Sequence, residues 1–406
     1  MATRKNGRGD EPTGRPAPRR HNLALTGFLL LVAAGVMLLL HRRTRVGVQA
    51  HLAAPYPRTL SEWRLFVVKQ GTLEPNQRVV AYDVNTPLFS DYADKYRFVW
   101  MPPGTSATYR AEGVFDFPLG TIFSKTFAFP APGHRGRDRL IETRLLVHAK
   151  SGWVGLPYVW NSQESEAALD IAADAVPVRF TDAYGHEHST NYLIPNANQC
   201  KECHARDKVM SPLGPTAPNL NRTDSYPSGA ANQLGHWSEV GYLKGAPEPA
   251  SAPRAAVWND PSTGTLEARA RTYLDINCGP CHRSGGAAAT SALYLDLANH
   301  DPETLGVCKM PVAAGRAAGN LFFDIVPGKP EESIIVHRME SIEPKVMMPE
   351  IARTLSHQEG IALIREWVRS LSGACVAATP PEPSAGQAAL GSTLIPPPEA
   401  RGAGVL

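Results

Sequence analysis

The sequence predicts an α+β protein in which a β-rich antiparallel domain is followed by a mainly α-helical domain, with a transmembrane helix ahead of both. Three observations support this prediction. An apolar run follows a basic N-terminus, short alternating runs fill residues 59–199, and longer helical periods appear in residues 262–376. With 406 residues, of which 43% are hydrophobic, the chain is long enough for two folded domains.

The N-terminus has the pattern of an exported, anchored protein. Six basic and two acidic residues precede an unbroken apolar run at 23–40, and a helix of that length spans about 27 Å, enough for a thin bilayer. The basic excess predicts that residues 1–22 form a disordered cytoplasmic segment. The chain is then expected to be anchored in the inner membrane with its bulk in the periplasm. Cleavage after Ala50, giving a soluble periplasmic protein, is the alternative.

Composition divides the rest of the chain. Residues 41–58 read as a linker, and 59–199 as the β-rich domain, since runs such as 121–129 alternate between apolar and polar residues and are bounded by Gly and Pro. Residues 200–261 are rich in Pro, Asn and Gly and are expected to be mostly loop, whereas 377–406 read as a disordered tail. The formal net charge of +3 resides in the basic N-terminus, so the folded part carries no basic surface suited to nucleic acid.

Two pentapeptides carry the chemistry of the chain. Residues 200–204 read CKECH and residues 278–282 read CGPCH, and both fit the pattern C-x-x-C-H. Two thiols at this spacing can each form a thioether with one vinyl group of a porphyrin, and the adjacent His204 or His282 can then ligate the iron. A zinc site needs four ligands, whereas each motif supplies at most three. The sequence therefore predicts two covalently attached c-type haems, bound through Cys200, Cys203, Cys278 and Cys281.

The last part of the chain, 262–376, combines helical periods with the second motif. Helices are expected at 266–276, 331–339 and 358–371, and a Met-Pro pair lies between the second and the third. This order of helix, C-x-x-C-H, loop, helix, Met-Pro and helix resembles a class I cytochrome c domain. The resemblance covers roughly 110 residues, and it implies that a methionine is the distal ligand of this haem.

The sixth ligand of each iron is sought among methionines and histidines. Met348 directly precedes Pro349, the position that matches the distal methionine of class I cytochrome c domains, and is preferred over Met347 for the second haem. His236 is the candidate for the first haem, because enough chain separates it from His204 to pass around a porphyrin. Other interpretations stay open for the first haem: an empty sixth position, or one of Met210, Met310, Met339, His148, His186 and His188.

Two cysteines lie outside the motifs, Cys308 and Cys375. An even leftover pair in an oxidising compartment favours a disulfide over two free buried thiols. The bond would tie the loop that follows the second motif to the end of the last helix.

Longer strings extend the resemblance over residues 60–372. Together they resemble a family of bacterial dihaem c-type cytochromes of unassigned function; the strings are TPLFSDYA at 86–93, ETRLLV at 142–147, GLPYVWN at 155–161, IPNANQC at 194–200, DIVPGKP at 324–330 and MMPE at 347–350. The resemblance implies an exported dihaem cytochrome and leaves its partner open. The expected N-terminal anchor is a departure, because members of the family look secreted or lipid-anchored.

Electron transfer is the function that the sequence favours. Two haems would pass electrons between periplasmic or membrane redox partners, while the protein tunes each potential. A dihaem peroxidase-like enzyme, in which the first haem has an open position, is the alternative. A third hypothesis makes the β-rich domain a binding or sensor module. No G-x-S-x-G, phosphate loop or H-E-x-x-H motif points to a hydrolase or transferase.

Overall fold

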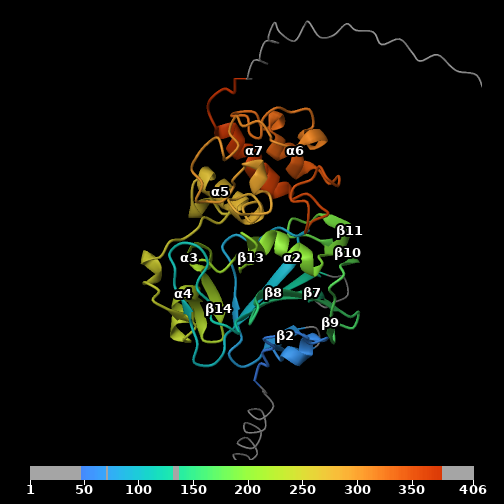
Figure 1. Cartoon of the computed structure of the whole chain (residues 1–406), viewed down its shortest axis with the longest axis vertical. Coiled ribbons are helices and arrows are strands. Elements are labelled where there is room, and N and C mark those ends of the chain that lie inside the picture. The colour runs from blue at the N-terminus through green and yellow to red at the C-terminus, as the bar shows by residue number, and fades with distance from the viewer. Residues whose placement is uncertain (1–46, 70–71, 131–136, 377–406) are drawn as a thin grey trace, which may run out of the picture.

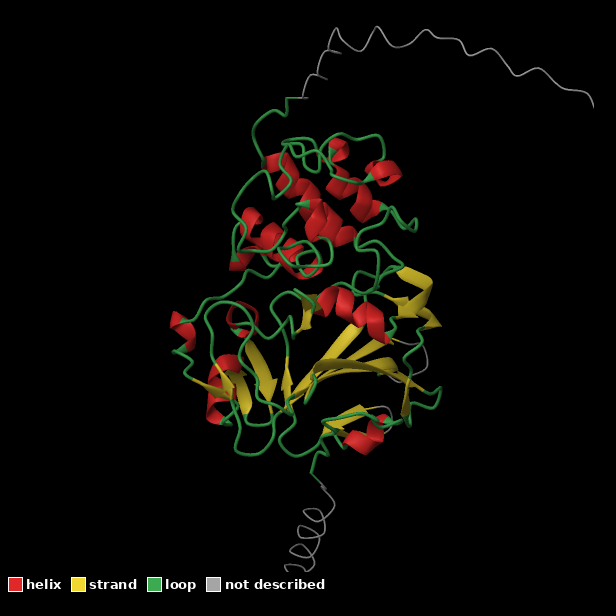
Figure 2. Ribbon diagram, viewed as in Figure 1, coloured by secondary structure: helices red, strands yellow, loops and turns green. Residues whose placement is uncertain are grey.

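The computed structural model describes residues 47–69, 72–130 and 137–376 (Figure 1). Strands gather in the N-terminal part, and the helices of the C-terminal part stand over one end of it (Figure 2). The expected segments 1–22, 23–40 and 377–406 lie outside the described residues.

A six-stranded antiparallel sheet forms the centre of the N-terminal part, in the order β3-β4-β6-β7-β8-β9. Strands β7 and β8 are joined by only two residues, Lys150 and Ser151, which fixes their register as a tight hairpin. The strands of this sheet are β3 (Val80–Tyr82), β4 (Asp94–Trp100), β6 (Ile122–Pro130), β7 (Asp138–Ala149), β8 (Gly152–Trp160) and β9 (Ala167–Leu169).

Smaller two-stranded sheets surround the central one. Four of them are antiparallel hairpins: β1 (Phe66–Lys69) with β2 (Thr72–Pro75), β10 (Asp174–Thr181) with β11 (Glu187–Ile194), β12 (Ala205–Arg206) with β13 (Val209–Met210), and β14 (Thr223–Tyr226) with β15 (Gly229–Asn232). The fifth pairs β5 (Ala107–Thr108) in parallel with β16 (Leu243–Lys244). The short helices of this region are η1 (Leu60–Trp63), α2 (Ala197–His204), α3 (Ala217–Leu220), α4 (Gln233–Glu239), η2 (Pro249–Ser251) and η3 (Pro261–Thr263).

Separate hydrophobic cores cover the two faces of the central sheet. Successive residues of a strand point to opposite faces, so Phe98 packs in the core around Trp63, whereas its neighbour Val99 packs in the core around Trp237. In the first core, the Trp63 indole donates a hydrogen bond of 2.7 Å to the Tyr158 hydroxyl. Burial of large aromatic side chains on both faces keeps the sheet rigid beneath the motif that follows it.

The C-terminal part contains three α-helices around one core. They are α5 (Leu266–Asn277), α6 (Ile334–Glu340) and α7 (Gln358–Ser370), with 12, 7 and 13 residues. Between them the chain forms loops and the short 3-10 turns η4 (Ala289–Ser291), η5 (Gly315–Ala318) and η6 (Pro330–Glu332). The prediction of a mainly α-helical, cytochrome c-like domain at 262–376 is therefore wrong. The Gly-, Ala- and Pro-containing stretch between α5 and α6 has no continuous apolar face, so helical propensity alone does not make it a helix.

The expected membrane anchor also needs correction. Within the described ranges, no helix is long and apolar enough to cross a membrane. The longest, α7, has 13 residues and carries polar residues on one side, because it packs only its other side against the core. The apolar run at 23–40 lies outside the described residues. The structure therefore shows no transmembrane anchor, and it does not support the predicted inner-membrane location.

Hydrogen bonds from one loop of the N-terminal part hold the two parts together. The buried Asp91 carboxylate accepts the backbone N–H groups of Thr354 at 2.7 Å and Leu355 at 2.8 Å. The neighbouring Tyr92 hydroxyl donates to Glu359 of α7 at 2.9 Å. A buried carboxylate that accepts several N–H groups is costly to separate from them. The two parts therefore form a fixed frame around the space between them.

Cys308 and Cys375 form a disulfide. It links the loop after the second C-x-x-C-H motif to the segment that follows α7, as the leftover pair of cysteines favours. The four remaining cysteines, all within the two motifs, are not bridged.

Candidate functional site

Residues from both parts enclose a cavity of about 1630 Å³. It exceeds the range of roughly 300–1,000 Å³ that is usual for a site of one small ligand. Both C-x-x-C-H motifs line it, with the side chains Cys200, Cys203, His204, Cys278, Cys281 and His282. The fold therefore brings to one space two motifs that lie in different parts of the chain.

The first motif lies on α2, which follows the end of β11. Asn196 begins this helix as its N-cap: its side chain accepts the N–H groups of Asn198 and Gln199, and the Gln199 side chain accepts the Asn196 N–H. Cys200 and Cys203 are then one turn apart and lie on the same side of the helix. The helix packs on β8 so closely that a Cβ placed on Gly155 would lie 3.2 Å from the Cβ of Cys200. Glycine at this position lets the first motif approach the sheet.

His204 ends α2 and is oriented by the hairpin that follows. Strands β12 and β13 return the chain so that the Ser211 carbonyl lies 2.9 Å from His204 Nδ1. Because a carbonyl can only accept, Nδ1 carries the proton and Nε2 keeps its lone pair. Burial lowers the pKa of His204 to about 4, which keeps the ring neutral at physiological pH. A neutral imidazole with a free Nε2 is the form that ligates iron.

The second motif begins where a helix ends rather than lying within it, but its histidine is oriented by a carbonyl as His204 is. Thr265 caps the start of α5, the helix ends at Asn277, and Cys278 is its C-cap residue. The Leu293 carbonyl lies 3.3 Å from His282 Nδ1 and again orients Nε2 for a ligand. Burial lowers the pKa of His282 as well. Both histidines are thus held in the tautomer and the charge state that a haem iron requires.

The two motifs touch each other. The Cys281 thiol donates to the Glu202 carbonyl at 3.6 Å, and the Asp207 N–H donates to the Gly285 carbonyl at 2.9 Å. A hydrogen bond from Cys281, opposed by burial, lowers the pKa of Cys203 to about 7. Groups attached to these two sulfurs would therefore be immediate neighbours.

The residues of the cavity fit two c-type haems. Four unbridged thiols occur in two pairs, each pair is followed by an oriented imidazole, and the enclosed volume exceeds that of an ordinary single-ligand site. The one disulfide of the described chain joins the two cysteines outside the motifs. The donor set could hold one haem per motif through two thioethers and a proximal nitrogen.

The methionine candidates fall into two groups. Met348 lines the cavity, whereas Met347 is buried in the protein and does not. Met339 of α6 also lines it, but Met210 and Met310 do not. Of the two neighbouring methionines, Met348 is thus the one whose side chain can reach the cavity, and its role as distal ligand of the second haem stays a prediction.

The histidine candidates for the first haem lie elsewhere. The His236 ring stacks on Tyr226 at a centroid distance of 3.6 Å and does not line the cavity. His148 Nδ1 lies 3.0 Å from the Phe117 carbonyl, and His186 and His188 lie at the β10–β11 turn. Among the described residues that line the cavity, His204 and His282 are the histidines. The structure thus does not bring His236 to the first motif.

A group of basic side chains on the cavity wall was missed by the sequence interpretation. Arg97, Lys125 and Arg144 lie side by side across β4, β6 and β7 and all line the cavity. Burial and the nearby Arg144 and Arg97 charges lower the pKa of Lys125 to about 7. The signal in the sequence is a charged residue within an apolar strand run, as in FSKTFAF at 123–129. In a buried strand, such a residue marks a polar site.

No protein-family profile, curated protein or solved structure matches the chain. The resemblance to dihaem cytochromes therefore stays a prediction, and the functional argument rests on the residues of the cavity.

Proposed function

We propose that the protein is a dihaem c-type cytochrome that carries electrons between redox proteins. One observation supports this above all others: both C-x-x-C-H motifs line one cavity and touch at Cys203 and Glu202 on one side and Cys281 on the other. A haem supplies one-electron exchange between ferrous and ferric iron when it is bound. Two cofactors attached to neighbouring sulfurs can exchange electrons directly, as a carrier requires.

The residues around the motifs have distinct tasks in this proposal. His204 and His282 would hold the two irons through Nε2, while the Ser211 and Leu293 carbonyls fix the orientation of the two rings. Met348, which lines the cavity, would offer a soft thioether to the second iron, and such a ligand would favour the ferrous state and raise the potential relative to bis-histidine ligation.

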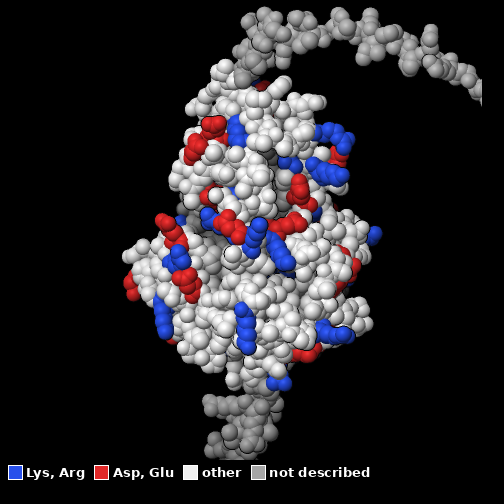
Figure 3. Space-filling view, in the orientation of Figure 1, with Lys and Arg blue, Asp and Glu red and all other residues white. Residues whose placement is uncertain are grey.

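The partner is expected to be a redox protein rather than nucleic acid. Lys and Arg side chains alternate with Asp and Glu on the face drawn in Figure 3, most densely where the two parts meet, and form no single-sign patch there. A mixed pattern of this kind suits docking on a protein of complementary pattern, which sets orientation more than affinity.

Haem content and redox titration test the proposal. The purified protein should retain two iron equivalents per chain under conditions that extract non-covalent haem, and both should titrate in a potentiometric experiment. Adjacent haems should also give a split Soret band in circular dichroism. Substituting Cys278 and Cys281 with Ala should remove one haem and abolish the splitting, whereas the same change at Cys308 and Cys375 should leave two haems. Retention of both haems in the first double variant would contradict the proposal.

A second function is supported by the cavity lining. Beyond the two proximal histidines, the lining contributes Met339 and Met348 as candidate ligands, both from the C-terminal part, within the residues that the structure describes. The first iron would then keep an open position beside Lys125, a site suited to binding peroxide or another small oxidant. Carbon monoxide discriminates the two functions. A spectral shift of one ferrous haem per chain, with turnover of peroxide by a ferrocytochrome donor, would identify an enzyme, and an unchanged spectrum would identify a carrier.

A further inference from the structure

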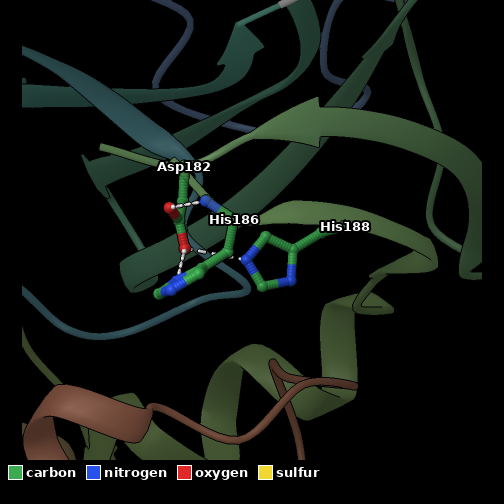
Figure 4. A group of neighbouring side chains, drawn as sticks. All are labelled: Asp182, His186 and His188. Carbon is green, nitrogen blue, oxygen red and sulfur yellow. Dashed lines mark hydrogen bonds and ion pairs between the residues drawn. The ribbon is translucent and has the colours of Figure 1, made fainter. Parts of the chain in front are cut away.

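A second cluster of ligand-type side chains lies outside the haem cavity, at the turn between β10 and β11. The Asp182 N–H donates to the His186 carbonyl at 2.9 Å, and Gly185, with φ +90°, provides the left-handed residue that closes the turn. Figure 4 shows Asp182, His186 and His188 gathered at this turn. The potential ligand atoms of these three side chains all lie within 4.8 Å of one another. Among the described residues, no other group of three or more His, Cys, Asp or Glu side chains meets this distance.

The Asp182 carboxylate is prepared for a cation. Its Oδ1 accepts the backbone N–H groups of Tyr184 and His186, both at 2.9 Å, so Oδ2 alone faces the imidazoles. The side chain is 1% exposed, and its ion-pair partners among the described residues are the two histidines. A covered carboxylate without a Lys or Arg partner leaves a negative charge that a metal ion can neutralise.

The two histidines differ in exposure: the His186 side chain is 67% exposed and that of His188 is 19% exposed. The His188 ring is held between Tyr92 and Phe180, each stacked on it at a centroid distance of 5.0 Å, and Nε2 lies 2.8 Å from Asp182 Oδ2. The His186 side chain faces solvent, and its Nδ1 lies 3.3 Å from the same oxygen. One ligand is therefore preorganised by packing, and the other can close on an ion from the solvent side.

We propose that Asp182, His186 and His188 form a site for one divalent transition-metal ion of the Zn²⁺ class. Two nitrogens and one carboxylate oxygen are a usual ligand set for such ions, and a fourth position would be left to water. Tetrahedral ligands about 2.0 Å from zinc lie about 3.3 Å apart, the separation already present between Oδ2 and His186 Nδ1. The contact of Asp182 Oδ2 with His188 Nε2, now 2.8 Å, has to lengthen by about half an ångström to admit an ion at this distance, and the ligand atoms of all three residues lie within 4.8 Å of one another.

Titration of the full-length, haem-loaded protein with Zn²⁺, followed by calorimetry, tests the site. The measured quantity is the difference between wild type and His186→Ala, so that Zn²⁺ bound elsewhere, including at cysteines, cancels. His186→Ala is the safest variant, because the exposed ring contributes little to packing. His300→Ala, which removes another exposed histidine, is the matched control. Asp182→Asn keeps a side-chain oxygen that can accept the Tyr184 and His186 N–H groups, while it removes the negative charge.

One Zn²⁺ equivalent per chain should be lost in His186→Ala and in Asp182→Asn and retained in His300→Ala. Removing a residue that only hydrogen-bonds to a metal ligand typically lowers metal affinity about 10–100-fold. Removing a ligand itself should therefore lower the affinity for this Zn²⁺ ion by at least about tenfold. Zn²⁺ should also raise the melting temperature of wild type more than that of His186→Ala. Equal stoichiometry and affinity in wild type and His186→Ala would overturn the site. That result would mean that His186 and His188 act only as hydrogen-bond partners of Asp182.

Discussion

Arg144→Met tests the buried charges on the sheet beneath the first motif. Arg144 and Glu142 point to the same face of β7, and Arg144 Nε donates to Glu142 Oε2 at 2.8 Å. The Glu142 side chain is fully buried, and the Tyr192 hydroxyl also donates to it at 2.7 Å. The Arg144 guanidinium lies 4.2 Å above the Phe127 ring. Removing the cation therefore leaves a carboxylate with no access to water and no opposite charge in contact.

The size of the effect follows from this burial. Breaking a buried ion pair by removing one partner costs about 3–5 kcal/mol, because the remaining charge is uncompensated. We therefore expect Arg144→Met to lower the free energy of unfolding by about 3–5 kcal/mol. Adding Glu142→Gln removes the stranded charge and keeps an acceptor for Tyr192. The double variant should lose only about 1–2 kcal/mol, the cost of imperfectly paired amide groups.

Urea unfolding followed by far-ultraviolet circular dichroism measures these changes, with haem content determined for each variant because Arg144 lines the cavity. Arg110→Met is the matched control: its pair with Asp116 is exposed at 55% and 64%, and its loss should cost less than about 1 kcal/mol. The reasoning is refuted if Arg144→Met costs as little as the control, or if the double variant loses the sum of the two single changes.

Three further predictions concern the C-terminal part. Met348→Ala should add one carbon monoxide-binding haem per chain to the reduced spectrum, whereas Met347→Ala, which changes a residue that does not line the cavity, should add none. Replacing Cys308 and Cys375 with Ser opens a loop of 67 residues and should lower the free energy of unfolding by about 4 kcal/mol; unaltered urea midpoints would contradict this. Burial raises the pKa of Asp275 from 3.8 to about 6, so its neutral form stabilises the fold at low pH and this stability is lost as pH rises through that range. Asp275→Asn should flatten the stability profile between those values, and an unchanged slope would exclude the residue as its cause.

The individual helices of the C-terminal part could be predicted from the sequence, but the large share of loops between them could not. Helix α7 runs from Gln358 to Ser370, within one residue of the expected span, because its apolar residues recur at helical spacing. The stretch between α5 and α6 has no such period, and its conformation depends on tertiary contacts such as the Cys308–Cys375 bond. Resemblance of element order therefore overstated the helical content.

The two distal-ligand predictions, Met348 and His236, also differ in whether a local feature of the sequence supports them. Met348 could be selected because a local feature, the following proline, marks it, and its side chain lines the cavity. His236 was selected only for the length of chain between it and His204, which limits reach but does not give direction. In the structure its ring stacks on Tyr226 and does not line the cavity that holds the first motif.

The sequence by itself carries the prediction of two c-type haems: two pentapeptides each hold paired thiols and a histidine, and thioether bonding and iron ligation depend on this local spacing. Tertiary structure alone decided that both motifs line one cavity and that Lys125 and Arg144 lie on its wall. These are contacts across strands or between segments far apart in the chain. They depend on sheet register and on packing between the two parts, which no local pattern encodes.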